Sequence, residues 1–229
     1  MTSVAFHADQ PFARVPGGIG AYIRGLVPAL AAAEPGLDLT LFHARFDEQP
    51  EAWMRDFPRV QLPQRIRTLY PSWALFGRPA LPAPLDRADL VHAPLPSAVP
   101  PVGRHQRLVV TVHDLAFRLY PAMYPPPWRV LYGLGLRRAI RHADMLLTCS
   151  RHTADDLVRA GAPPRRIRVT WLAPSLPVGR DDPGPALDRL RIPRPYVLFV
   201  GTLEPRKNVA RLIGAYRKAI GAKGLRHAR

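Results

Sequence analysis

Short apolar segments alternate with longer amphipathic segments through most of this chain, and this alternation restricts the possible folds more than any other feature. The candidate strands are short and rich in apolar residues, and they are residues 4–7, 37–43, 89–92, 108–112, 145–149 and 167–172. The candidate helices repeat apolar residues every three or four positions, and they are residues 22–30, 128–142 and 151–160. This alternation predicts parallel βαβ units, and therefore an α/β fold with helices on both faces of a mostly parallel sheet.

Two proline-rich stretches interrupt this pattern. Residues 44–88 contain many prolines, so we expect no long regular element there, although Trp53 and Trp73 indicate that parts of the stretch pack. Residues 173–195 contain six prolines and two glycines, which is typical of a linker. We therefore predict an α/β domain over residues 1–172, a linker over 173–195 and the start of a second domain over 196–229.

The second domain is predicted to begin with a strand at residues 196–200 and a helix after Asn208. Arg206 and Lys207 stand where that helix begins, and a helix N-terminus with added positive charge is suited to binding a phosphate. The alternative is that both are solvated surface cations. Only 21 residues follow Asn208, fewer than the roughly 50 that a domain needs, so we expect this second domain to be incomplete.

A glycine-rich turn, Gly17-Gly18-Ile19-Gly20, leads from the first predicted strand into the helix that contains Tyr22. Glycine at this position lets the backbone approach a phosphate or a sugar closely. The spacing differs from the dinucleotide-binding fingerprint, so a plain tight turn remains an equal alternative.

His113 and Asp114 follow the predicted strand 108–112, and ligands of open α/β sheets bind outside the carboxyl ends of the strands. An imidazole there can donate a hydrogen bond to a sugar hydroxyl. The alternative is that His113 caps a loop and that Asp114 fixes a turn. The histidines have no metal-ligand spacing with one another or with Cys149, so we expect no bound metal. Cys149, the single cysteine, is predicted to be an inert buried thiol.

The formal net charge is +16, which raises the question of nucleic acid or anionic surfaces as partners. Arginine supplies 30 of the 33 basic residues, and no compact basic run with interleaved aromatic residues is present. We therefore expect no nucleic-acid partner and favour a phosphate-bearing ligand or an anionic lipid surface. No apolar run approaches the roughly 18 residues of a membrane helix, and we expect a cytoplasmic protein, with the inner face of the membrane as a possible attachment site.

Five segments together resemble the retaining glycosyltransferases of family four, which have the GT-B architecture of two Rossmann-like domains facing a cleft. The segments are Gly17–Tyr22, Val91–Pro94, Val110–Leu115, Ala143–Ser150 and Gly201–Asn208. The resemblance implies a Rossmann-like N-terminal domain on the acceptor side, followed by the first strand and helix of the nucleotide-sugar domain.

The resemblance also implies roles for individual residues. Gly18 and Gly20 would lie near the donor phosphate and sugar, and His113 beside the transferred sugar. Arg206 and Lys207 would bind the donor diphosphate in place of a metal ion. Asp114 and Tyr22 are further candidates for this site.

The implied function is transfer of a hexose, with mannose considered first, from a nucleotide sugar to a glycan or a lipid-linked acceptor. The family's pair of glutamates, seven residues apart in the C-terminal domain, has no counterpart after Lys207. We therefore expect the chain to be truncated and inactive alone, with a separately encoded C-terminal half as a candidate partner. Two alternatives remain open: a non-catalytic module that binds a glycan or an anionic surface, and a basic nucleic-acid-binding protein.

Overall fold

The computed structural model describes residues 1–174 and 182–221, and the chain divides into two units, Met1–Ser175 and Leu176–Arg229. Pro177 and Gly179 of the predicted linker lie outside the described residues. No helix within the described ranges is long and apolar enough to cross a membrane.

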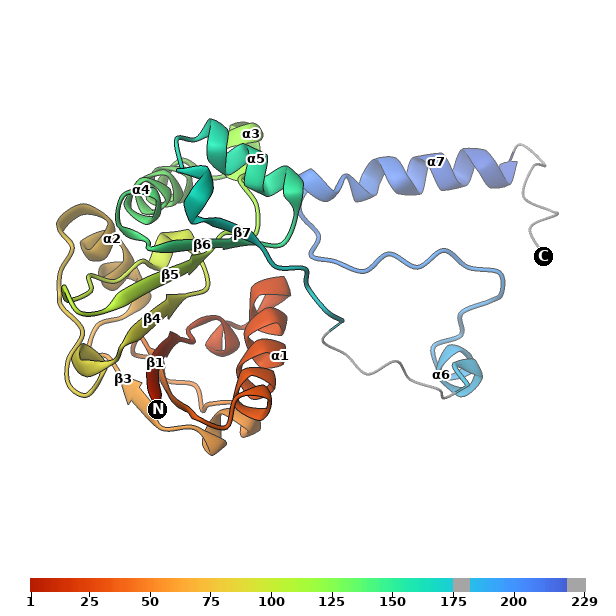
Figure 1. The fold of residues 1–229 in the computed structure, drawn as a ribbon. Coiled ribbons are helices and arrows are strands. Elements are labelled where there is room, and N and C mark those ends of the chain that lie inside the picture. The colour runs from red at the N-terminus through yellow and green to blue at the C-terminus, as the bar shows by residue number, and fades with distance from the viewer. Residues whose placement is uncertain (175–181, 222–229) are drawn as a thin grey trace. The chain divides into compact units, whose positions relative to one another are not determined.

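The first unit is built on a parallel sheet of seven strands in the order β3-β2-β1-β4-β5-β6-β7 (Figure 1). The strands are β1 (Thr2–His7), β2 (Leu37–His43), β3 (Arg59–Gln61), β4 (Leu90–Ala93), β5 (Arg107–Thr111), β6 (Met145–Thr148) and β7 (Ile167–Val169). This sheet confirms the predicted α/β fold. The predicted strand at 167–172 is shorter than expected, because pairing of β6 with β7 ends at Val169.

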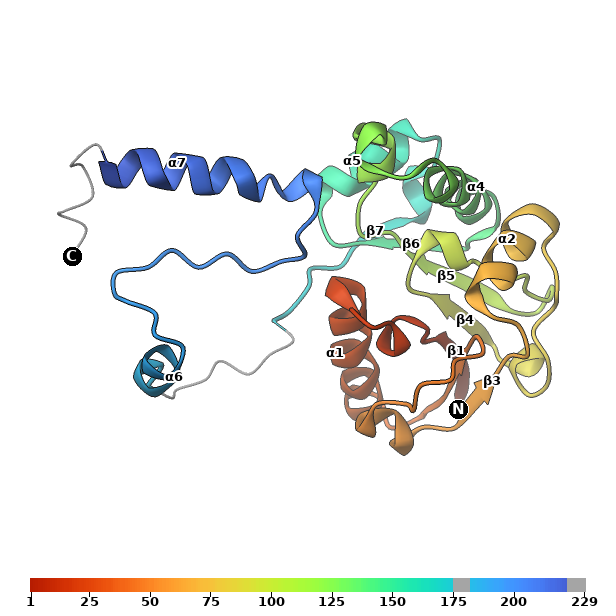
Figure 2. The ribbon, with the colours of Figure 1, turned by 180° about the vertical axis from the view of Figure 1, so that it is seen from behind.

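Helices cover both faces of the sheet. The helices of the first unit are α1 (Gly17–Ala33), α2 (Ile66–Phe76), α3 (Ala116–Leu119), α4 (Pro126–His142) and α5 (Arg151–Arg159). On one face, Val4 and Phe6 of β1 pack with Ile23 and Val27 of α1. Buried residues of α2, α4 and α5 share a second core with the opposite side of the strands, and Figure 2 shows the two layers from behind.

The direction of chain progression reverses beside β1. From β1 the chain moves outward to β2 and β3, and then α2 carries it back to β4 on the other side of β1. The connections that leave the carboxyl ends of β1 and β4 therefore diverge, and such a switch point is where open α/β sheets bind ligands.

The stretch 44–88 is more regular than its prolines predict. It contains β3 and the 11-residue helix α2, which accommodates Pro71 in its interior. The prediction of no long element was wrong here, because burial of Leu69, Tyr70 and Trp73 against the sheet outweighs the loss of one backbone hydrogen bond at proline.

The second unit contains α6 (Gly184–Arg189), the 3-10 helix η7 (Pro205–Lys207) and α7 (Val209–Gly221). The helix predicted after Asn208 is confirmed. The strand predicted at residues 196–200 is wrong: this segment has no strand pairing, and Val197, Leu198 and Val200 are exposed. A strand requires a neighbour for its backbone groups, and the described part of this unit supplies none.

Candidate functional site

The carboxyl ends of β4 and β5 and the first turns of α1 meet at one edge of the sheet. His92 lies in β4, Thr111 ends β5, and Tyr22 projects from α1 onto both. Thr111 Oγ1 is 2.8 Å from His92 Nε2 and 3.2 Å from the Tyr22 hydroxyl, so one buried hydroxyl links the two strands to the helix. This linkage fixes Tyr22 beside the loop that follows β5.

His113 lies in that loop and meets Tyr22 edge to face, with ring centroids 4.9 Å apart. Its Nε2 is 3.1 Å from the carbonyl oxygen of Pro94, and a carbonyl can only accept, so Nε2 carries the proton. The remaining nitrogen, Nδ1, therefore accepts hydrogen bonds. The expectation that this imidazole donates to a sugar hydroxyl is corrected, because Pro94 already engages the proton.

The backbone of His113 is held from the opposite side. Its carbonyl oxygen accepts from Cys149 Sγ and from Thr153 Oγ1, each at 3.3 Å. Thr153 is itself placed by Ser150, whose side chain caps the start of α5. Cys149 is half-buried, and burial raises the pKa of its thiol, which favours the inert form.

Burial keeps the imidazoles of this edge neutral. Burial, with a smaller contribution from the neighbouring His113, lowers the pKa of His92 to about 3. Burial also lowers the pKa of His113, against the opposing effects of the Pro94 carbonyl and of Asp114. At neutral pH, His113 is therefore an uncharged hydrogen-bond acceptor rather than a cation.

Asp114 has a local role in the structure. Its Oδ1 accepts a hydrogen bond from the Ala116 amide at 3.0 Å, which shapes the turn into α3. The carboxylate is exposed and its other oxygen has no partner among the described residues. The turn-forming alternative accounts for this geometry, and the second oxygen is available to a ligand.

The glycines of the turn 17–20 differ from one another. They form the first turn of α1 rather than a separate loop before it. A Cβ on Gly20 would lie 2.3 Å from Pro16 Cβ, so close packing requires glycine there. A Cβ on Gly18 would meet nothing within 4 Å, and Gly17 has a φ of +61°. Gly18 is thus the exposed member, with open space beside it, and Gly20 is a packing residue.

Arg206 and Lys207 belong to the second unit, which is described separately from the first. Both lie in η7, before α7 begins at Val209. The prediction that they stand at the start of that helix is therefore corrected. Arg206 Nη2 is 2.8 Å from Glu204 Oε1, whereas Lys207 is exposed. Arg206 and Lys207 remain a candidate pair for anion binding, and the Arg206 guanidinium already pairs with the Glu204 carboxylate.

A second polar cluster lies at the carboxyl end of β1, and sequence reasoning missed its central residue, Asp9. The carboxylate accepts from the Ala44 amide at 2.7 Å and from the Tyr70 hydroxyl at 2.8 Å, and it lies 3.0 Å from His7 Nε2. Burial alone would raise the pKa of Asp9, but the adjacent His7 imidazole and the hydrogen bonds from Ala44 and Tyr70 together lower it.

Asp9, and Thr111 of the first cluster, which sequence reasoning also missed, both had a signal in the sequence. Asp9 stands two positions after a strand end, as His113 does after β5, and Thr111 lies on the same side of its strand as His113 by alternation.

Within the described residues, no group of three or more histidine, cysteine, aspartate or glutamate side chains is placed to hold a metal ion.

Comparison with known proteins gives a family match. Residues 16–171 match the family described as Glycosyltransferase Family 4. The chain is 30% identical over 240 residues to O-antigen chain mannosyltransferase B of Escherichia coli, covering 91% of this chain and 58% of that protein. Among solved structures, it resembles Anabaena Alr3699/HepE in complex with UDP-glucose, with a TM-score of 0.53 and 15% identity, covering 83% of this chain and 50% of the other. The chain thus spans about half the length of these proteins.

Proposed function

Because this chain belongs to glycosyltransferase family 4, we propose that it takes part in transferring a hexosyl group, mannose first among the hexoses, from a nucleotide sugar to a glycan or lipid-linked acceptor. Retention of configuration is part of this proposal. The relative named as an O-antigen chain mannosyltransferase supports mannose as the sugar and a bacterial polysaccharide as the product.

The contact of His113 with Tyr22, near the start of α1, is the observation that carries the proposal. Its neutral Nδ1 is an acceptor, so we propose that a hydroxyl of the transferred sugar donates to it. Tyr22 and Pro94 hold the ring in place, so little order has to be gained on binding.

The donor phosphates are proposed to lie at the N-terminus of α1. The exposed backbone at Gly18 offers N–H groups there, and the helix dipole favours an anion. In the second unit, Arg206 and Lys207 are proposed to bind a donor diphosphate and to stabilise the charge that develops on the leaving group. No metal ion is required in this arrangement.

The experiment is a titration of the full chain with GDP-mannose and with UDP-glucose. Binding is monitored through the NMR signals of Gly18, Gly20 and the His113 imidazole. Backbone amides and a neutral imidazole supply no full charge, so we expect affinities of about 1 mM from the first unit. Lys207→Ala should weaken binding of both nucleotide sugars if Lys207 contacts the diphosphate.

One matched pair of variants and one single substitution test the assigned contacts. His113→Asn keeps an acceptor near the position of Nδ1, whereas His113→Gln keeps only the donor to Pro94, so Gln should lose about fivefold more affinity. Gly18→Ala has no steric cost in the chain itself and should weaken binding only through the ligand. If neither nucleotide sugar perturbs Gly18 or His113, the proposed donor site is wrong.

A further inference from the structure

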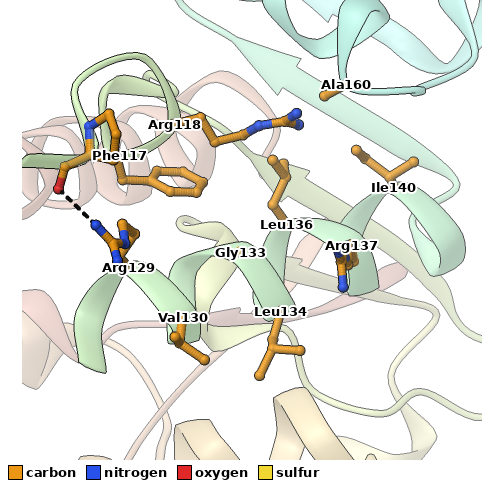
Figure 3. A pocket seen from close by; sticks show the side chains of 11 residues that line it. Phe117, Arg118, Arg129, Val130, Gly133, Leu134, Leu136, Arg137, Ile140 and Ala160 are labelled. Carbon is orange, nitrogen blue, oxygen red and sulfur yellow. Dashed lines mark hydrogen bonds between the residues drawn. The ribbon is translucent and has the colours of Figure 1, made fainter. Parts of the chain in front are cut away.

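A groove of about 620 Å³ runs between α3 and α4, and none of the candidate site residues lines it (Figure 3). Phe117 and Leu136 lie within it, and Ala160 of the segment after α5 closes one end. Three arginines surround it: Arg118 on the α3 side, and Arg129 and Arg137 on α4. The groove therefore combines an apolar floor with a positively charged margin.

The segment that carries this margin contains no carboxylate side chain. Residues 115–143 contain five arginines and no aspartate or glutamate. Arg118, Arg129 and Arg137 are exposed, and none has an acidic partner among the described residues. The polar contact that Arg129 makes is a donation to the carbonyl oxygen of Pro121 at 3.4 Å. Three guanidinium groups are thus available to phosphate oxygens.

Large apolar side chains are exposed beside the arginines. They are Leu119, Tyr120, Met123, Trp128 and Val130, and Val130 is 58% exposed. Trp128 and Val130 lie in the first turns of α4, and Tyr120 and Met123 lie in the adjacent segment after α3. Tryptophan and tyrosine prefer the headgroup level of a bilayer, where a ring is partly apolar and partly wet.

We propose that these five apolar residues, together with Arg118, Arg129 and Arg137, form a docking surface for an anionic phospholipid bilayer. These eight residues are the α3–α4 surface. The arginines bind headgroup phosphates, and Trp128 and Val130 enter the interface. This inference goes beyond the proposed sugar transfer and holds whether or not the chain transfers a sugar.

Charge decides between the possible occupants. A two-fold contact between copies would place each arginine cluster against another or near it, which is unfavourable. A nucleic acid would satisfy the arginines but would leave five apolar side chains without a partner. An anionic bilayer satisfies both groups at once.

The test is flotation of the full chain with vesicles of phosphatidylcholine alone and of phosphatidylcholine mixed with phosphatidylglycerol. We expect binding to the mixed vesicles and little to the neutral ones. The triple variant Arg118→Ser, Arg129→Ser, Arg137→Ser should weaken binding by more than tenfold, since each basic residue near an anionic surface contributes about fivefold. The control replaces three other exposed arginines, Arg55→Ser, Arg67→Ser and Arg104→Ser, and removes the same charge.

Tryptophan fluorescence gives a second readout. Trp128→Phe should abolish the blue shift on binding mixed vesicles, whereas Trp171→Phe, at another exposed tryptophan, should not. All these positions are exposed, and circular dichroism checks that each variant folds. Trp128→Ser keeps the charge and should still weaken binding.

Three outcomes would overturn the proposal. The control triple could weaken vesicle binding as much as the α3–α4 triple, which would indicate a diffuse charge effect. Binding to duplex DNA that depends on the α3–α4 arginines, without vesicle binding, would indicate a nucleic-acid surface. A dimer in sedimentation that Val130→Ser dissociates, again without vesicle binding, would indicate contact between copies.

Discussion

Tyr22 and His113 meet edge to face at an interplanar angle of 82°, although 91 residues separate them in the sequence. Burial raises the pKa of Tyr22, so its hydroxyl stays protonated and remains bonded to Thr111. Tyr22 therefore contacts His113, the candidate sugar contact, with its ring, and its hydroxyl connects α1 to Thr111 of β5.

Replacing Thr111 should show how much this connection contributes. Thr111→Val keeps the shape but leaves the Tyr22 hydroxyl and His92 Nε2 without their buried partner, so we expect a loss of about 2–3 kcal/mol in the free energy of unfolding. Thr111→Ser keeps the hydroxyl and serves as the control in denaturant unfolding. Equal stability of the two variants would contradict this account.

The buried imidazole of His92 predicts a dependence of stability on pH. Its pKa falls from the ordinary 6.5 to about 3 in the folded chain, so between these values only the unfolded chain takes up the proton. Titration of His92 should therefore leave the free energy of unfolding unchanged above pH 6.5. It should decrease by roughly 3–5 kcal/mol as the pH falls toward 3.

His92→Gln should remove this part of the slope, measured as the free energy of unfolding in denaturant at several pH values. A residual slope from His113 and His43, whose pKa values burial also lowers, should remain. An unchanged slope in the variant would show that His92 titrates normally in the folded chain.

Asp9→Asn should be strongly destabilising. The asparagine would place an amide where a carboxylate now accepts from the Tyr70 hydroxyl and the Ala44 amide and lies 3.0 Å from His7 Nε2. Breaking a fully buried charge network typically costs about 3–5 kcal/mol. Because the folded pKa of Asp9 is lowered, its contribution is present above the ordinary 3.8 and is lost as the pH falls through the folded value. Thermal unfolding at neutral pH and at pH near 3 should therefore show a larger difference between the two proteins at neutral pH.

Two glycines in α4 offer a matched pair of alanine substitutions. A Cβ at Gly135 would lie 2.2 Å from the Pro96 carbonyl oxygen, so Gly135→Ala must displace the helix and should cost about 1–3 kcal/mol. A Cβ at Gly133 would meet nothing within 4 Å, and Gly133→Ala should stabilise the helix by up to about 1 kcal/mol. Melting temperatures that move in the same direction for both variants would contradict the packing described here.

Hydrogen exchange should distinguish the two units. Amides of residues 196–200 lack a strand partner, and the apolar residues Leu212, Ile213 and Ile220 of α7 are exposed. We expect these regions to exchange much faster than β5 and β6, whose amides bond to neighbouring strands. Equal protection would mean that the second unit is packed in solution.

The sequence predicts β1, β4 and β5 well because most of their residues are buried and therefore read as apolar runs. It misses β3, none of whose three residues is buried. It predicts α2 poorly because proline is a local signal, whereas the burial of Trp73 depends on strands distant in the sequence. It predicts a strand at residues 196–200 because those residues are apolar, but apolar composition does not supply a neighbouring strand.

The same distinction applies to the candidate site. His113 could be found because residues after a parallel strand lie at the ligand edge of the sheet. Its protonation could not, because the proton position depends on Pro94, which follows a different strand. Gly18 and Gly20 look alike in the sequence, and only the position of Pro16 separates the open residue from the packed one.

The central position of β1 has a consequence for synthesis on the ribosome. β1 is translated before all other strands, yet β4, its neighbour on one side, begins only at Leu90. At 5–20 residues per second, roughly 4–17 s pass between the two. During that interval one edge of β1 has no neighbouring strand, so the nascent chain is a substrate for chaperones until β4 has left the exit tunnel.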